Sequence, residues 1–316
     1  MARIYRSLDE VPADFGPCAL TIGNFDGVHA GHRAIVRRVC AVAAANGWKA
    51  SALTFEPHPT RIVAPSRTPR LMTTPEDRCR LMALEGIQQV LILPFDESVA
   101  HLSPEEFAAR IVAGRLGAKA VLVGRNFRFG HRQAGDVRAL EALGSRFGFT
   151  TEVVPAVAVH GRLVSSSGIR SEVEAGRMAA ARHMLGRPYS LQDAVIPGHG
   201  VGSKQTVPTL NLAVTAEVLP ASGVYVTRTS DLESDRVWPS VTNVGYRPTF
   251  GGDTLGVETY LLERLQGERP VRIRVEFLRR LRDERKFASA EELKTQILRD
   301  AVRASTYFRR LRKCHN

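Results

Sequence analysis

The sequence predicts an α/β protein in two parts, an N-terminal parallel sheet covered by helices and a C-terminal antiparallel sheet of short strands. Over the first ~185 residues, short apolar runs alternate with helical patterns, and strand–helix–strand order is typical of parallel sheets. From about Asp193 the helical patterns give way to short strands separated by turn residues, as in a small barrel or sandwich. We therefore expect a first domain over 1–186 and a second over 187–316.

In the first part, strands and helices follow each other in order. Runs of apolar residues predict strands at 18–23, 49–55 and 119–124. Apolar residues at helical spacing, ended by Gly47, predict a helix over 31–47. Similar patterns predict a capped helix over 103–117 and another helix over 170–185. Ligands of such sheets lie at the carboxyl ends of the strands, where the unusual residues of this chain cluster.

In the second part, apolar runs bounded by turn residues predict strands at 194–198, 207–214, 223–228, 238–245, 257–262 and 271–278. A final helix follows over 293–311. Ser289 and Glu292 form a capping box in front of it.

Composition limits the class of protein. The 316 residues are 44% hydrophobic and 24% charged, and no apolar run approaches the ~20 residues of a membrane span. The N-terminus lacks the apolar core of a secretory signal, so we expect a cytoplasmic protein. The scattered cysteines argue against a zinc site or a disulfide framework, and we expect reduced thiols, three of them buried, at Cys18, Cys40, Cys79 and Cys314.

The net charge of +12 is consistent with anionic partners, which include nucleotide phosphates and nucleic acid. A basic solvated surface explains the charge equally well. The sequence must therefore be judged on its motifs.

The stretch TIGNFDGVHAGH, from Thr21 to His32, lies between a predicted strand and a predicted helix. A helix start attracts phosphate through its unpaired N–H groups, and Gly23 and Gly27 let the backbone approach a ligand. His29 and His32 are three residues apart, hence on one helical face, and can donate hydrogen bonds to a polyphosphate. Structural histidines or a metal site are the alternatives, but the whole string is more specific than a lone pair of histidines.

Several further stretches occur in order along the chain. They are TFEPHP (54–59), VGRNFRFG (123–130) with Gly135-Asp136, SSSGIR (165–170), LGRPY (185–189), PTLN (208–211), NVGYRPTF (243–250), VETYLL (257–262) and RDERKF (282–287). Together with the HxGH signature, they resemble the family of bifunctional prokaryotic riboflavin kinase/FMN adenylyltransferases, also called FAD synthetases. The resemblance covers nearly the whole chain.

For the first part, the resemblance implies a Rossmann-like nucleotidyltransferase. The catalytic residues would be His29, His32 and Arg170, which would stabilise charge on ATP phosphates. ATP would also contact Gly23, Asn24, Phe25, Asp26, Gly27, Ser166 and Ser167. The flavin would contact Asn126, Phe127 and Phe129. From the residues alone, Ser166 or Ser167 is better explained as a helix N-cap, and the two phenylalanines as core. This chain has Asn126 and Gly168 where the family often has Asp and a larger residue.

For the second part, the resemblance implies a riboflavin kinase barrel. Gly198 and Gly202 would belong to a loop over ATP, which is no P-loop because Ser203 separates Gly202 from Lys204. Thr209 and Asn211 would bind Mg²⁺, and Glu258 would be the general base. Without the resemblance, Thr209 and Asn211 are a polar strand edge and 279–287 is a solvated charge run. The chain departs from the family at Gln205–Val207 and in a shorter segment over 263–270.

The predicted activity is therefore ATP-dependent phosphorylation of riboflavin to FMN, then adenylylation of FMN to FAD and pyrophosphate. The expected partners are these small molecules, with Mg²⁺ as cofactor, and a second copy of the chain in a homo-oligomer, but neither nucleic acid nor a membrane. Two alternatives stay open. One is an enzyme with a single active half, the kinase being the half more easily lost. The other is a flavin-binding regulator of nucleic acid, although no helix-turn-helix pair or aromatic RNA-binding signature is found.

Overall fold

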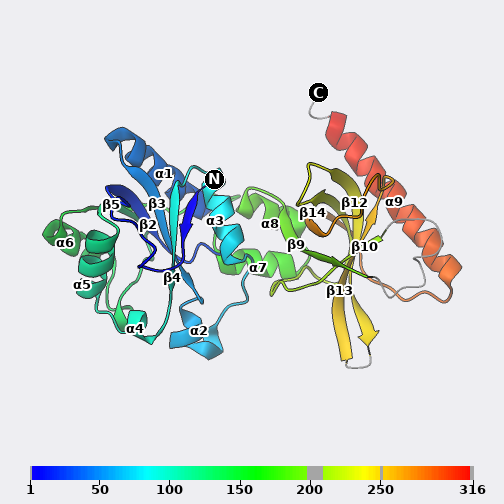
Figure 1. The fold of residues 1–316 in the computed structure, drawn as a ribbon. Helices are drawn as coiled ribbons and strands as arrows, with labels where there is room; N and C mark the ends of the chain where they lie inside the picture. Colours follow the sequence, from blue (N-terminus) through cyan, green and yellow to red (C-terminus); the bar gives the residue numbers. More distant parts are fainter. Residues whose placement is uncertain (1, 198–208, 250–251, 314–316) are drawn as a thin grey trace. The chain divides into compact units, whose positions relative to one another are not determined.

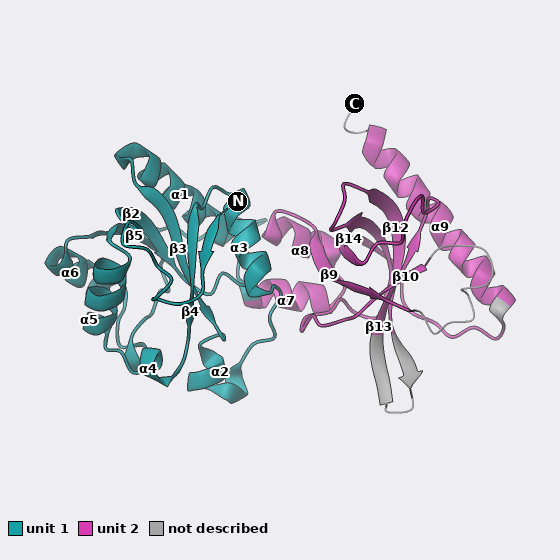
Figure 2. Ribbon diagram, in the orientation of Figure 1, with its two compact units in different colours: residues 1–166 teal, residues 167–316 magenta. Residues whose placement is uncertain are grey.

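The structure is a computed structural model that describes residues 2–197, 209–249 and 252–313, with the side chains of 246–249, 252–255 and 290 left aside (Figure 1). It divides into two compact units, Met1–Ser166 and Ser167–Asn316 (Figure 2). Each unit is described by itself below.

The first unit is built on a six-stranded sheet with the order β1-β4-β3-β2-β5-β6. Every neighbouring pair is parallel, which confirms the predicted parallel sheet. Its strands are β1 (Arg3–Tyr5), β2 (Cys18–Ile22), β3 (Lys49–Glu56), β4 (Gln89–Pro94), β5 (Ala118–Gly124) and β6 (Thr150–Val154). The chain leaves β2 for β3 on one side and returns to β5 on the other, so the carboxyl end of β2 lies where the strand order reverses.

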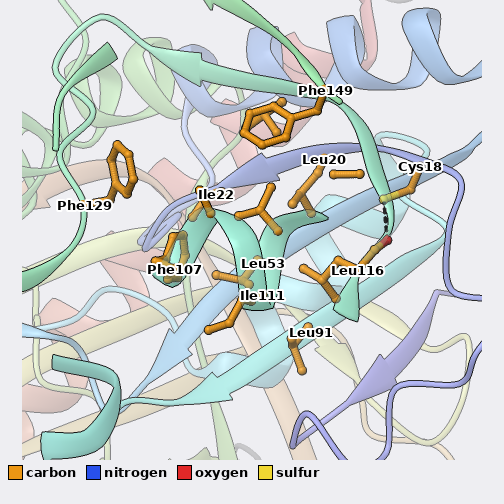
Figure 3. Close-up of a cluster of buried hydrophobic side chains, with 14 of the residues drawn as sticks. Cys18, Leu20, Ile22, Leu53, Leu91, Phe107, Ile111, Leu116, Phe129 and Phe149 are labelled. Atoms are coloured by element: carbon orange, nitrogen blue, oxygen red, sulfur yellow. Dashed lines mark hydrogen bonds between the residues drawn. The ribbon is translucent and has the colours of Figure 1, made fainter. Parts of the chain in front are cut away.

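Helices cover both faces of this sheet. One core cluster joins the sheet to α1 (Ala30–Asn46) and α3 (Pro75–Leu84). The other joins it to the π-helical segment η2 (Phe107–Arg115), which continues α5 (Pro104–Glu106), and to α6 (Val137–Phe147). Figure 3 shows this second cluster, in which the Cys18 thiol donates to the Leu116 carbonyl at 3.3 Å. Short elements complete the unit: α2 (Thr60–Val63), η1 (Pro65–Arg67), α4 (Glu97–Ala100), η3 (His131–Gln133), β7 (Ala158–Val159) and β8 (Arg162–Leu163).

Most of the predicted elements of this part are confirmed. Gly47 ends α1 with a left-handed backbone, φ 67°, and its N–H bonds back to the helix carbonyls. Ser103 and Glu106 form the capping box of the second predicted helix, although the helix widens to π geometry after its first turn. Cys18 and Cys79 are buried and Cys40 is half-buried, while Cys314 lies outside the described residues.

The single helix predicted over 170–185 is wrong. The second unit has two helices there, α7 (Ser166–Glu174) and α8 (Met178–Leu185). Gly176 separates them with a φ of 71°, a conformation that ends a right-handed helix and that glycine adopts without steric cost. A Cβ on Gly176 would also lie 3.0 Å from both Arg280 Cδ and Tyr225 Oη, so the break lets the chain pack closely on the barrel.

The rest of the second unit is a closed barrel with the strand order β10-β13-β12-β11-β14-β9. All of its pairings are antiparallel, and β9 closes it by pairing with β10. Its strands are β9 (Tyr189–Ile196), β10 (Thr209–Leu212), β11 (Gly223–Asp231), β12 (Val237–Thr249), β13 (Gly252–Leu261) and β14 (Arg272–Arg282). The second part is thus a barrel and not a sandwich. Its first strand, β9, begins five residues before the predicted start at 194.

Helix α9 (Ala290–Lys313) covers part of the outer face of the barrel (Figure 1). Its Ala304 joins a cluster with Val224, Val226 and Val241, which lie on β11 and β12. The predicted capping box is confirmed in part: Glu292 N–H donates to Ser289 Oγ at 3.2 Å, but the Glu292 carboxylate accepts from Ala288 N–H instead of Ser289 N–H.

The barrel interior contains a continuous chain of buried hydroxyls. Thr229 contacts Ser240 at 2.8 Å, Ser240 contacts Thr227 at 2.8 Å, Thr227 contacts Thr242 at 2.7 Å and Thr242 contacts Thr259 at 2.9 Å. Each hydroxyl is fully buried, and each finds its partner inside the chain. Because these bonds join β11, β12 and β13, they stabilise the register of the strand that carries Glu258.

Candidate active sites

The loop between β2 and α1 holds its shape through an unusual backbone. Phe25, Gly27 and Val28 have φ values of 49°, 80° and 36°. Two of these residues are not glycine, so their left-handed conformations carry a cost that packing must offset. Phe25 and Val28 are both buried in the core that also contains α1, which provides that packing. The tight turn ends at His29, directly before the helix.

His29 is the N-cap of α1, and its Nδ1 accepts a hydrogen bond from His32 N–H at 3.3 Å. An accepting Nδ1 carries no proton, so the ring proton of neutral His29 is on Nε2. Gly31 makes room for this ring, because a Cβ on Gly31 would lie 3.1 Å from His29 Cε1 and 3.2 Å from Nδ1. Glycine in the HxGH signature therefore has a steric role, because it leaves space for the His29 ring.

The structure brings the two predicted histidines together. Their rings stack with centroids 3.6 Å apart and an angle of 14° between planes. Phe25 and His32 pack in a T-shaped pair, with ring centroids 5.3 Å apart. Burial, with a smaller contribution from His29, lowers the pKa of His32 well below its ordinary value of 6.5. His32 is therefore neutral at physiological pH, and its buried Nδ1 has no hydrogen-bond partner among the described residues.

Asp26 anchors this loop to the segment before α3. Its Oδ1 accepts hydrogen bonds from Met72 N–H at 2.9 Å, Thr73 N–H at 3.1 Å and Thr73 Oγ1 at 3.0 Å. Its carbonyl accepts from Ser166 Oγ at 3.0 Å. Asp26 is 4% exposed, so these bonds hold the loop rather than present a carboxylate to solvent. Its predicted contact with ATP stays a prediction.

Asn24 connects the loop to residues that the sequence analysis did not single out. Its side-chain nitrogen lies 3.0 Å from His58 Nε2. Arg78 is fully buried and donates to the Asn24 carbonyl at 2.9 Å and to Glu56 Oε2 at 2.9 Å. The loop is thus held from the carboxyl end of β3 and from α3. The sequence indicates His58 only as part of the TFEPHP stretch. Nothing in the sequence indicates that Arg78 is buried.

The predicted flavin residues lie after β5. Asn126 is exposed, Phe127 is half-buried and Phe129 is buried in the core. The two rings stack with centroids 5.5 Å apart, and Gly135 allows this because a Cβ there would lie 2.6 Å from the Phe129 ring. A hollow of about 460 Å³ is lined by Arg125, Asn126, Phe127, Arg128, Asp136, Val137 and Arg138. Asn126 and Phe127 therefore face open space, whereas Phe129 supports them from the core.

Two other predicted residues of the adenylyltransferase site belong to the second unit. Ser167 and Arg170 lie in α7, where Arg170 Nη2 donates to Ser167 Oγ at 3.2 Å. Gly198 and Gly202, predicted to cover ATP in the kinase half, lie outside the described residues. The roles of these four residues stay predictions.

The second candidate site is a row of polar residues across three strands of the barrel. Asn211 of β10 and Asn243 of β12 both pair in register with Glu258 of β13. Paired residues of antiparallel strands lie on the same face, so the three side chains are neighbours. Thr209 lies on that face too, two residues from Asn211. Asn211 is 3% exposed and Glu258 half-buried. Asn243 is not among the predicted site residues, although it lies in the NVGYRPTF stretch.

Comparisons with known proteins agree with this fold over both units. A model of the FAD synthetase family matches residues 11–168, and a model of the riboflavin kinase family matches residues 185–308. Bifunctional riboflavin kinase/FMN adenylyltransferases from Pseudomonas fluorescens and Escherichia coli are 34% and 32% identical to this chain. These alignments cover 96% of both chains for the first relative, and 98% of this chain and 97% of the other for the second.

A relative of the same name from Bacillus subtilis is 30% identical over 93% of both chains. A crystal structure described as a macrolide-efflux protein from Streptococcus pneumoniae has a TM-score of 0.82 and 25% identity, and the match covers 95% of this chain and 97% of that one. Within the described part of the chain, no helix has the length and apolarity needed to cross a bilayer.

A parallel α/β unit with a helix N-terminus after its central strand, together with a small antiparallel barrel, defines an ATP-dependent transferase of two catalytic modules. The chain belongs to the family of bifunctional riboflavin kinase/FMN adenylyltransferases. It phosphorylates riboflavin to FMN with ATP, and it then adenylylates FMN with a second ATP to give FAD and pyrophosphate. Both predicted activities are thereby confirmed. The chain is thus placed with the bifunctional enzymes, and not with the two alternatives, an enzyme with one active half or a flavin-binding regulator.

Proposed function

We propose that FMN adenylylation takes place at the N-terminus of α1, with His29 as the residue that contacts the ATP phosphates. The observation that carries this proposal is the Nδ1 of His29, which accepts from the helix and so leaves the proton on Nε2. A phosphate oxygen of FMN attacks the α-phosphorus of ATP, and the bond to pyrophosphate breaks. The Nε2–H of His29 and the helix N-terminus stabilise the negative charge that develops on the leaving group.

His32 has a different task in this proposal. Its neutral ring stacks on His29 and packs against Phe25, which fixes the orientation of the His29 ring. The resemblance to the family adds Arg170, Ser166 and Ser167 as phosphate contacts, and it assigns the flavin to Asn126 and Phe127.

The kinase reaction is proposed to use the row Asn211–Glu258–Asn243. The Glu258 carboxylate takes the proton from the ribityl 5′-hydroxyl of riboflavin as that oxygen attacks the γ-phosphorus of ATP, and the bond from this phosphorus to the β,γ-bridging oxygen breaks so that ADP leaves. Oxygens of Thr209 and Asn211 would hold Mg²⁺. Both residues fit a hard cation because they offer neutral oxygen ligands beside a carboxylate, and Asn211 is nearly inaccessible to solvent. When bound, the ion neutralises charge on the ATP phosphates.

Steady-state kinetics of the two half-reactions test these assignments. We expect Glu258→Gln to lower kcat of FMN formation by about 10² to 10⁴-fold and to leave FAD formation from FMN unchanged. We expect His29→Ala to lower kcat of FAD formation from FMN and to leave FMN formation unchanged. A Glu258→Gln enzyme with normal kcat would show that another group is the base, and Glu291→Gln, at an exposed site of α9, is the matched control.

We also propose a domain boundary at residues 186/187, which a kinase-family match beginning at 185 supports, although the two compact units divide at 166/167. It places the enzyme in the cytoplasm, where reduced cysteines are expected; Cys18, Cys40 and Cys79 are all free thiols. Size-exclusion chromatography with light scattering measures whether the chain forms a homo-oligomer.

A further inference from the structure

Arg78, on α3, is a fully buried cation that the proposed reactions do not use. Its Nη2 donates to Glu56 Oε2 at 2.9 Å. Its Nη1 donates to the Asn24 carbonyl at 2.9 Å and makes longer contacts, 3.3 Å to Thr54 Oγ1 and 3.4 Å to the Phe55 carbonyl. A buried charge is costly unless it is paired and hydrogen-bonded. The guanidinium meets this condition by joining the ends of β2 and β3.

The contact with Asn24 fixes the orientation of one peptide group in the loop before α1. Besides Arg78, the Thr54 hydroxyl donates to the Asn24 carbonyl at 3.4 Å. The bond between Asn24 and Phe25 is trans, and in a trans peptide the N–H points opposite to the C=O. Because the guanidinium holds the carbonyl, it also directs the Phe25 N–H away from Arg78.

The Phe25 N–H is a donor that the protein itself does not use. Two neighbouring N–H groups have partners inside the loop region: Gly27 donates to Thr73 Oγ1 at 3.0 Å, and Val28 donates to the Phe25 carbonyl at 2.9 Å. Phe25 is 2% exposed, yet none of the residues that the structure describes accepts a hydrogen bond from its N–H. Buried N–H groups are nearly always paired, so this one is suited to a ligand.

We propose that Arg78 is a positioning residue for FMN adenylylation, which directs the Phe25 N–H at a phosphate oxygen of ATP. This inference rests on the proposed site at the N-terminus of α1. The positive charge at the Asn24 carbonyl also polarises the peptide group, which makes the Phe25 N–H a stronger donor to an anion. Arg78 does not itself touch the substrate, because its guanidinium is occupied by Asn24 and Glu56.

NMR of enzyme labelled with [¹⁵N]phenylalanine tests this proposal. The Phe25 amide signal is identified as the one missing from Phe25→Leu. Inorganic pyrophosphate is the probe, because it carries phosphate oxygens and no base or sugar. In the unchanged enzyme we expect it to move the Phe25 amide proton downfield, as a hydrogen bond to an anion does. In Arg78→Met this shift should be largely lost, whereas Arg80→Met, at a more exposed position of α3, should keep it.

Kinetics give the second readout. For Arg78→Met we expect kcat/KM for ATP in FAD formation from FMN to fall about tenfold to a hundredfold, with riboflavin phosphorylation unchanged. Arg78→Lys keeps the buried charge but lacks the two-pronged guanidinium, so it should lose about tenfold. Signals of the core residues Phe15, Phe107 and Phe149 in the same spectra show whether the first unit is folded. If Arg78→Met does not fold, Arg78→Lys decides the question.

Three results would overturn the proposal. One is a Phe25 amide that does not respond to pyrophosphate in the unchanged enzyme. Another is a response of equal size in a folded Arg78 variant. The third is normal FAD formation by Arg78→Lys and by a folded Arg78→Met. Failure of the proposed site itself looks different, because His29→Ala would then retain its kcat for FAD formation.

Discussion

Asn211 of β10 pairs in register with Glu258 of β13, so two residues far apart in the sequence lie side by side on one face of the barrel. Asn243 of β12 flanks Glu258 on its other side. Cross-strand neighbours have Cβ atoms about 5 Å apart, close enough for a metal ligand and a base to act on the same pair of substrates. The pairing explains how short strands can bring together the residues of the proposed phosphoryl-transfer site.

Replacing Asn211 should change how the kinase depends on magnesium. With Asn211→Ala, we expect the Mg²⁺ concentration that gives half-maximal FMN formation to rise by about tenfold or more, because one oxygen ligand is lost. Velocity measured over a Mg²⁺ series at saturating ATP checks this. The same series for FAD formation from FMN should be unaffected, and an identical shift in both reactions would contradict the assignment of Asn211 to the kinase site.

Gly31→Ala should impair only the adenylyltransferase. The added Cβ would lie 3.1 Å from the His29 ring, so the ring must shift from the position that the N-cap hydrogen bond gives it. We expect FAD formation from FMN to fall by about tenfold or more, since a small displacement of a phosphate-binding group is costly. Riboflavin phosphorylation by the same variant is the internal control. Normal FAD formation would show that the His29 orientation does not matter.

His32 should remain neutral well below pH 6.5. Its pKa in the folded chain is lowered by burial, whereas the unfolded chain titrates near the ordinary 6.5. Between these two pKa values the unfolded state binds the extra proton, so the free energy of unfolding falls as the pH drops below about 6.5, by up to ~1.4 kcal/mol per pH unit. Above that pH the contribution is fully present. NMR of the imidazole resonances checks this, and a His32 signal that titrates near pH 6.5 would contradict it.

Much of this architecture could be predicted from the sequence, because apolar periodicity and capping residues are local signals. His29, His32, Asn211 and Glu258 stand in short motifs, so the sequence indicates them as candidates, and their roles stay predictions. Arg78 was not found, because its burial depends on contacts with Asn24 and Glu56 across 54 and 22 residues. Glu284 lies in a run that the sequence predicts to be solvated, but its carboxylate accepts from Ser222, which is distant in the sequence. The helix break at Gly176 was missed because glycine alone does not end a helical pattern.

Thr242→Val should destabilise the barrel. The substitution preserves shape but removes the hydroxyl that contacts both Thr227 and Thr259, and it leaves those buried hydroxyls with fewer partners. We expect a loss of about 1–3 kcal/mol in the free energy of unfolding. Thermal or urea unfolding of the full chain, followed through kinase activity, measures it. Thr295→Val, at an exposed position of α9, is the matched control, and equal effects of both would mean that the buried chain adds no stability.

In the most direct measurement, two variants are mixed, each with a substitution in one of the two proposed sites. Glu258→Gln and His29→Ala are incubated with riboflavin, ATP and Mg²⁺, separately and together, and the flavins are separated by chromatography. Over a time in which the unchanged enzyme converts riboflavin to FAD, we expect at most traces of FMN or FAD from the first alone, FMN with at most traces of FAD from the second alone, and FAD from the mixture, because FMN made by one chain is adenylylated by the other. FAD from either variant alone at the rate of the unchanged enzyme, or none from the mixture even when FMN is added, would contradict two separate sites at Glu258 and His29.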